Sequence, residues 1–97
     1  MVEYIPLPTI GEILKEEFME PYALSQNALA RAIFVPPNRI HQILKGIRRI
    51  TADTDLRLTK FFGMSEGYFL RIQENLELRQ AKRLIAGELN NIKQIQG

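Results

Sequence analysis

The chain has 97 residues, of which 45% are hydrophobic and 25% charged, and its formal net charge is +2. That size and composition are typical of a globular chain with one modest core. The sequence contains no cysteine, which excludes disulfides, thiolate chemistry and the usual structural zinc sites, and no apolar run long enough to span a membrane. Since a signal-peptide pattern is also lacking, we expect a cytoplasmic protein.

The charge is unevenly distributed along the chain. Residues 1–25 carry five acidic residues against one basic residue, for a net charge of −4. Residues 26–60 carry seven basic residues against two acidic ones, for a net charge of +5, and residues 61–97 carry +1. A basic segment this distinct indicates a surface that binds a polyanion. A mixed, solvated surface without a partner is the alternative interpretation.

The first regular element is predicted to begin after Thr9. Residues 1–8 contain two prolines and no periodicity, so we expect an irregular arm there. Thr9 and Glu12 form a capping-box pattern, and apolar residues follow at helical spacing: Ile10, Ile13, Leu14 and Phe18. Pro21 is expected to end this helix, whose acidic residues then form a solvated face rather than a catalytic pair.

Residues 25–45 have the pattern of two short helices joined by a tight turn. Ser25 is a suitable N-cap for the first helix, and its apolar stripe is Ala28, Leu29, Ala32 and Ile33. Pro36 and Pro37 interrupt the pattern, and Pro37 suits the first turn of a new helix. The buried stripe of that second helix is Ile40, Ile43 and Leu44. Such a pair is typical of a helix-turn-helix, in which the second helix enters the major groove of DNA.

Two further helices are predicted after the helix-turn-helix. Thr51 caps the first, from residue 52 to about residue 62, with three residues toward the core: Leu58, Phe61 and Phe62. Ser65 caps the second, whose buried stripe is Tyr68, Phe69, Ile72 and Leu76. Beyond it, apolar residues recur at spacings of three and four: Leu78, Ala81, Ile85, Ile92 and Ile95. We interpret residues 79–97 as a helical extension that supplies part of a homodimer interface or a docking surface; a frayed tail is the alternative.

Four stretches carry a resemblance to a known family: GEILKEEF (11–18), SQNALARAI (25–33), VPPNRI (35–40) and ITADTDLRLTKFFG (50–63). They are similar to the lambda-repressor-like DNA-binding proteins and, among these, to the HigA-type antitoxins, also called virulence-associated protein I. The likeness covers residues 7–78. It implies an all-α domain of five or more helices over residues 9–78, with the helix-turn-helix at 25–45.

The same resemblance implies a function and partners. A protein of this family is expected to be a transcriptional repressor and an antitoxin, which binds a HigB-like, mRNA-cleaving toxin and represses the operon that encodes both. Since a single helix-turn-helix binds DNA weakly, we expect a homodimer on an inverted-repeat operator of double-stranded DNA.

Matching the chain to the family pattern assigns DNA contacts to eight residues. Gln26 is expected to contact the DNA backbone, because free N–H groups at a helix N-terminus favour a phosphate. The other seven are Pro37, Asn38, Arg39, His41, Gln42, Lys45 and Arg48. Asn and Gln amides can pair with adenine and an Arg fork with guanine, whereas Lys45 and Arg48 suit phosphates. His41, the only histidine, is expected at a polar rim near the backbone rather than in a metal or catalytic site.

Two positions depart from the family pattern, since Phe34 and Arg49 stand where relatives often carry glycine. The turn at Phe34 favours a positive φ, which costs phenylalanine on the order of 1 kcal/mol or more. We therefore expect either a remodelled turn with Phe34 anchored in the core, or a first helix that ends differently.

No enzyme, cofactor or metal site is predicted, because the sequence has one histidine, no cysteine and no phosphate-binding glycine loop. Three alternatives to an antitoxin stay open. The chain could be a stand-alone regulator of the same fold without a toxin, or a protein-interaction module whose basic segment binds an acidic partner. A nucleic-acid-modifying enzyme lacks catalytic groups. Fold alone does not decide among these functions.

Overall fold

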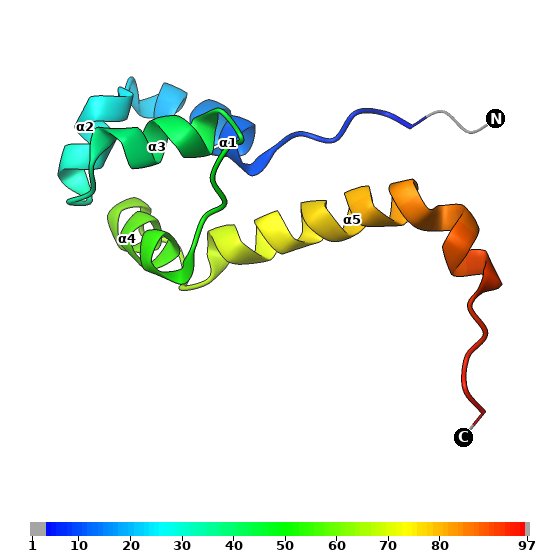
Figure 1. Cartoon of the computed structure of the whole chain (residues 1–97). Helices are drawn as coiled ribbons and strands as arrows, with labels where there is room; N and C mark the ends of the chain where they lie inside the picture. Colours follow the sequence, from blue (N-terminus) through cyan, green and yellow to red (C-terminus); the bar gives the residue numbers. More distant parts are fainter. Residues whose placement is uncertain (1–3, 97) are drawn as a thin grey trace.

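All regular secondary structure in the computed structural model, which describes residues 4–96, is helical, as predicted. The elements in chain order are α1 (Ile10–Ile13), η1 (Leu14–Met19), η2 (Glu20–Tyr22), α2 (Gln26–Ala32), α3 (Pro37–Leu44), α4 (Ala52–Phe62) and α5 (Tyr68–Asn91). Figure 1 shows α1 to α4 gathered at one end, with α5 extending away from them. None of these helices combines the length and the apolar character that crossing a membrane requires.

The first helix begins with the predicted capping box. The backbone N–H of Glu12 donates to Thr9 Oγ1 (3.1 Å), and the N–H of Thr9 donates to Glu12 Oε1 (3.2 Å). The helix then widens into the π-type turns of η1 and closes as the 3-10 turn η2, which contains Pro21. Before it, residues 4–8 have no regular structure, in line with the predicted arm; residues 1–3 of that arm lie outside the described residues.

One hydrophobic core joins the helices. Its buried members are Leu14, Met19, Leu29, Ala30, Ile33, Val35, Ile40, Ile43, Ile50, Leu58 and Phe69. Phe18 packs edge-on against Phe62 and Phe69, with ring centroids 5.2 and 5.0 Å apart, and so joins η1 to α4 and α5. Each fully buried leucine, isoleucine or phenylalanine side chain of this core contributes about 1.5–3 kcal/mol to folding. This core fixes the positions of the short helices, which would be marginal alone.

Two residues predicted to be buried are exposed. Ala32 lies on the exposed side of α2, because Leu29, Ala30 and Ile33 form the stripe that faces the core. Phe61 lies beside the buried face of α4 and remains 44% exposed, although its ring packs against Phe62. Both predictions were wrong because a helical stripe has two edges, and only packing against neighbours decides which edge is covered.

Glycine sets the closest contact between α1 and α3. A Cβ atom at Gly11 would overlap the carbonyl oxygen of Ile43 and the Cα of Leu44. Gly11 is buried, so α1 lies directly against the last turn of α3. The close crossing predicted between the two helices of the helix-turn-helix is a separate contact, between α2 and α3, and of its three alanines Ala30 is fully buried.

The N-terminus of α5 is capped by a carboxylate from α4. Asp55, which is almost fully buried, accepts hydrogen bonds from the backbone N–H groups of Gly67 (2.6 Å), Phe69 (2.9 Å) and Leu70 (3.1 Å). The prediction that Ser65 caps this helix is therefore wrong, since its Oγ accepts from Arg71 instead. A cap from outside the helix leaves no local sequence pattern.

The loop between α3 and α4 is held by a second buried polar side chain. Gln73 of α5 accepts a hydrogen bond from the N–H of Ile50 (2.7 Å) and donates one to its carbonyl (2.9 Å). Both backbone groups of Ile50 are thereby satisfied inside the core. This pairing fixes the end of the loop that carries Arg48 and Arg49.

The predicted extension is the second half of α5 rather than a separate helix. The backbone of α5 leaves helical geometry at Ile85 (φ −116°, ψ 21°) and the helix ends at Asn91. Ile92 and Ile95, which were expected to continue the apolar stripe, lie beyond the helix. Residue 97 lies outside the described residues. The exposed large apolar residues of this half are Leu84, Ile85 and Leu89, and exposed Leu78 directly precedes it.

We predict that Asp55→Ala lowers the free energy of unfolding by about 2–4 kcal/mol, because three N–H groups at the start of α5 lose their acceptor. Ser65→Ala is the matched control and should cost under about 0.5 kcal/mol, as expected of an exposed contact. Urea unfolding followed by circular dichroism measures both. Equal losses in the two variants would contradict the assignment of the cap to Asp55.

Candidate nucleic-acid interface

The orientation of α3 about its own axis is fixed by two isoleucines. Ile40 and Ile43 are fully buried, and Pro37 occupies the first helical position after an extended Pro36 (φ −62°, ψ 142°). Both findings agree with the sequence prediction. Because these side chains point into the core, the opposite face of the helix points outward. The outward face carries exposed Asn38, His41 and Lys45 and half-buried Gln42.

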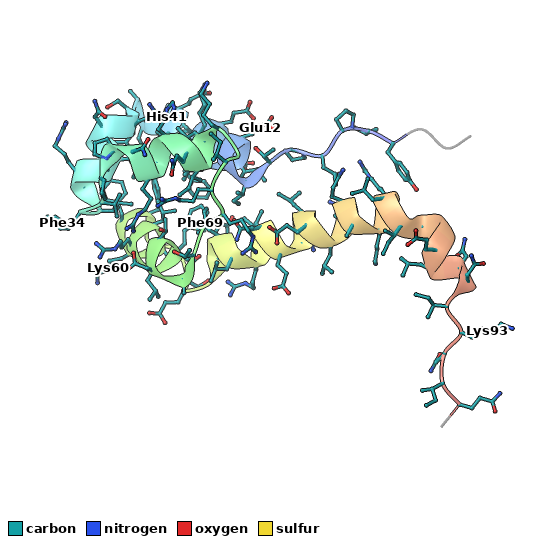
Figure 2. All side chains as sticks on the ribbon, in the orientation of Figure 1. Glu12, Phe34, His41, Lys60, Phe69 and Lys93 are labelled. Atoms are coloured by element: carbon teal, nitrogen blue, oxygen red, sulfur yellow. The ribbon has the colours of Figure 1, made fainter. Side chains whose placement is uncertain are left out.

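Phe34 occupies the turn in the left-handed region, with φ +59°. Its N–H donates to the carbonyl of Arg31, and the N–H of Val35 donates to that of Ala30 (3.0 Å), so α2 ends as helices that close on glycine do. The side chain of Phe34 is 85% exposed, and Figure 2 shows it projecting from the end of the molecule. The expectation that the ring is anchored in the core is wrong, because Val35 fills that place.

The guanidinium of Arg57 stabilises this turn through hydrogen bonds to its backbone. Arg57 of α4 donates through Nη1 to the carbonyl of Ile33 (2.9 Å) and, at a longer distance, to that of Phe34 (3.3 Å). Through Nε it donates to Asp53 Oδ2 (3.0 Å), one helical turn earlier in α4. The turn and the start of α4 are therefore tied together by one side chain.

Asp53 also forms an ion pair with Arg39, one of the predicted base readers. Its Oδ2 accepts a hydrogen bond from Arg39 Nη1 at 2.8 Å. The hydrogen bonds from Arg57 and then Arg39 hold the pKa of the Asp53 carboxyl below its ordinary value, so it is ionised at neutral pH. The part played by Asp53 and Arg57 was not predicted from the sequence, although their i,i+4 spacing was a signal of an ion pair.

The far end of α3 is closed by Gly46, whose φ is +77°. The N–H groups of Ile47 and Arg48 then donate to the carbonyl of Gln42, at 2.9 and 3.2 Å, which directs the loop away from the helix. Arg48 is exposed on this loop.

Arg49, the next residue, is paired with α5. Its guanidinium donates two hydrogen bonds to the carboxylate of Glu77, at 2.6 and 2.8 Å. This contact raises the pKa of Arg49 and lowers that of Glu77. Arg49 has a negative φ, so its departure from the family's glycine causes no strain of the kind seen at Phe34.

The structure places the eight predicted site residues in three groups. Gln26, His41 and Lys45 line one hollow between the end of the first helix, the start of α2 and the end of α3. Pro37, Asn38 and Arg39 lie on the first turn of α3, with Gln42 one turn on. Arg48 lines a separate hollow that is bounded by the arm and α5. No predicted residue is buried, and all lie on or next to the helix-turn-helix.

The first turn of α2 provides a second feature suited to a phosphate. Ser25 caps the helix by accepting from the N–H of Ala28 (3.1 Å), as predicted. The remaining N–H groups of that turn have no partner within the helix. Gln26 stands among them, at the edge of the hollow that it shares with His41 and Lys45. Together with the basic residues, this turn makes the surface suited to a polyanion.

The chain is similar to known proteins that are named virulence-associated protein I or HigA. Virulence-associated protein I of Dichelobacter nodosus is 45% identical over 73 residues, covering 75% of this chain and 68% of its own. Among solved structures, a HigA-family antidote protein from Coxiella burnetii is 35% identical, with a TM-score of 0.84 over 95% of this chain and all of its own. Antitoxin HigA of Pseudomonas aeruginosa, solved with the higBA promoter, is 29% identical, with a TM-score of 0.82 over 92% and 98%. No protein-family model matches the chain.

We predict that Phe34→Gly raises the free energy of unfolding by about 0.5–1 kcal/mol, because glycine adopts the positive φ without strain and the lost ring is exposed. Ala32→Gly is the control: this exposed residue has helical geometry, so glycine should destabilise by about 0.5–1 kcal/mol. Thermal or urea unfolding gives the sign of each change. A destabilised Phe34→Gly protein would show that the ring contributes to the fold.

Proposed function

The chain belongs to the family of HigA antitoxins and virulence-associated protein I, and from that premise we propose that it is a sequence-specific DNA-binding repressor and the antitoxin of a toxin–antitoxin module. It acts in the cytoplasm as a homodimer, binds an inverted-repeat operator and represses the operon that encodes it and its toxin. It is not an enzyme. Residues 9–78 form the DNA-binding domain, and residues 79–97 are its C-terminal extension.

The observation that carries this proposal is the exposed face of α3. Burial of Ile40 and Ile43 leaves Asn38 and Gln42 pointing away from the core, with Arg39 at their side. Side-chain amides pair bidentately with adenine, and a guanidinium pairs with guanine O6 and N7. These three residues read bases on a helix that lies in the major groove, and Pro37 lies at the entry of that helix.

The remaining site residues hold the DNA backbone. Gln26 and the N–H groups at the start of α2 bind one phosphate, with His41 and Lys45 beside them. Arg48 binds a second phosphate from the loop after α3. Such contacts fix the register of the protein on the duplex without reading its sequence.

A salt titration tests DNA binding itself. The protein is titrated against a duplex from its own promoter and against a scrambled duplex, at several salt concentrations. Because several phosphates are contacted, the affinity should fall by orders of magnitude between low and physiological ionic strength, and the promoter should be preferred at every salt concentration. Weak binding that ignores both sequence and salt would rule out the repressor and favour a protein-interaction module.

We predict that the site residues of α3 and the following loop differ in role: some determine sequence preference and others only the overall affinity for DNA. Arg39→Ala and Gln42→Ala should reduce the preference for promoter over scrambled duplex, by roughly 1–3 kcal/mol each. Lys45→Ala and Arg48→Ala should weaken binding to both duplexes equally and make the salt dependence shallower. Competition titrations measure the ratios. If Arg39→Ala and Lys45→Ala changed the two affinities in the same way, the assignment of base readers would be wrong.

The second half of α5 is proposed to form part of the homodimer interface. Its exposed apolar residues, which include Leu84 and Leu89, have no covering element among residues 4–96. We predict that truncation after Gln80 converts the dimer to a monomer, as measured by mass in solution. A truncated protein that stays dimeric would exclude this segment from the interface.

The toxin partner is proposed from family membership. Co-expression with the product of an adjacent toxin-like gene should give a stable complex and relieve the toxin's effect on growth. Absence of such a gene beside this one would favour the stand-alone regulator instead.

A further inference from the structure

We propose that Asp53 is a specificity-determining positioning residue, which presents the guanidinium of Arg39 to the major groove in the geometry needed to read a base. The inference rests on the proposed function. Asp53 lies in the first turn of α4 and does not itself contact a base; it acts through Arg39.

The hydrogen bond to Asp53 leaves part of the Arg39 guanidinium available to contact a base. A guanidinium carries five N–H donors, and bidentate pairing with guanine uses two of them. Asp53 accepts from Nη1 alone, at 2.8 Å, and Nε and Nη2 have no hydrogen-bond partner among the described residues. The side chain of Arg39 is 27% exposed, so its remaining donors can reach outside the protein.

Asp53 is suited to this role because it is held from the other side. Arg57 donates to the same oxygen, Oδ2, at 3.0 Å, and is itself anchored on the carbonyls of Ile33 and Phe34. The chain of contacts therefore runs from the turn before α3, through α4, to the first turn of α3. An arginine held in this way loses less rotamer freedom when it binds DNA than a free one.

The charge balance also favours a role at the DNA surface. An isolated carboxylate beside α3 would repel phosphates, but here one carboxylate lies between two guanidiniums. The trio has a net charge of +1, so Asp53 orients Arg39 while the local charge remains attractive to DNA.

Affinities of the full-length chain for the promoter duplex and a scrambled duplex test the inference. The variants are Asp53→Asn, Arg39→Ala and the double variant. Arg39→Ala should lower the promoter preference by roughly tenfold. Asp53→Asn should lower it by roughly fivefold or more, and the double variant should lose no more than Arg39→Ala alone, because both changes disable the same contact.

Glu77→Gln is the matched control. It also removes one carboxylate from an exposed pair with arginine, that of Arg49, and changes the net charge by the same amount. Its promoter preference should equal that of the unchanged protein. Unfolding curves of every variant are measured alongside. If Asp53 had a purely structural role, its substitution would lower the affinity for both duplexes equally, and this loss would be the same with or without Arg39.

Three results would overturn the inference. An unchanged or increased promoter preference in Asp53→Asn would show that Asp53 is passive or competes with DNA for Arg39. A further loss in the double variant would show that Asp53 does not act through Arg39. If Arg39→Ala itself kept the full preference, the proposed base contact would fail as well, which separates failure of the proposed function from failure of the positioning role.

Discussion

The burial of Ile40 and Ile43 is the constraint on which the interface depends. A helix as short as α3 has no stable orientation of its own, and its rotation is fixed by what its apolar side chains contact. Gly11 lets α1 lie directly on the backbone of the last turn of α3, so α1 covers this end of the helix closely. The outward direction of Asn38 and Gln42 follows from this packing rather than from any polar contact of their own.

Polar side chains from α4 and α5 fix the segments that the core does not reach. Asp55 joins α4 to the start of α5, Gln73 joins α5 to the loop after α3, and Arg57 joins α4 to the turn before α3. Each of these groups satisfies backbone atoms at a chain reversal, where regular hydrogen bonding ends. The two ends of α3 are therefore held by the helices that follow it in the sequence, and the helix-turn-helix would be incomplete without them.

The sequence predicted what local patterns determine. Helical periodicity indicated the helices, and the caps at Thr9, Ser25 and Thr51 were predicted from their own side chains and those of the next turn. The sequence led us to expect that Phe34 would remodel the turn or change where the first helix ends, whereas the residue itself adopts the positive φ. What the sequence could not predict joins residues far apart in the chain: Asp55 caps a helix that starts more than ten residues later, and Arg39 pairs with Asp53 across a loop. The contacts of the site residues with DNA remain predictions.

The most direct test of the interface is to map it on the intact protein. The chain is labelled with nitrogen-15, and amide chemical shifts are followed while a duplex from its own promoter is added. We expect the largest shifts at the first turn of α2, along α3 and in the loop to Arg49, and none in the second half of α5, where slower tumbling of the complex only broadens the lines. Shifts confined to α5, or an absence of change along α3, would contradict the placement of the DNA on this face.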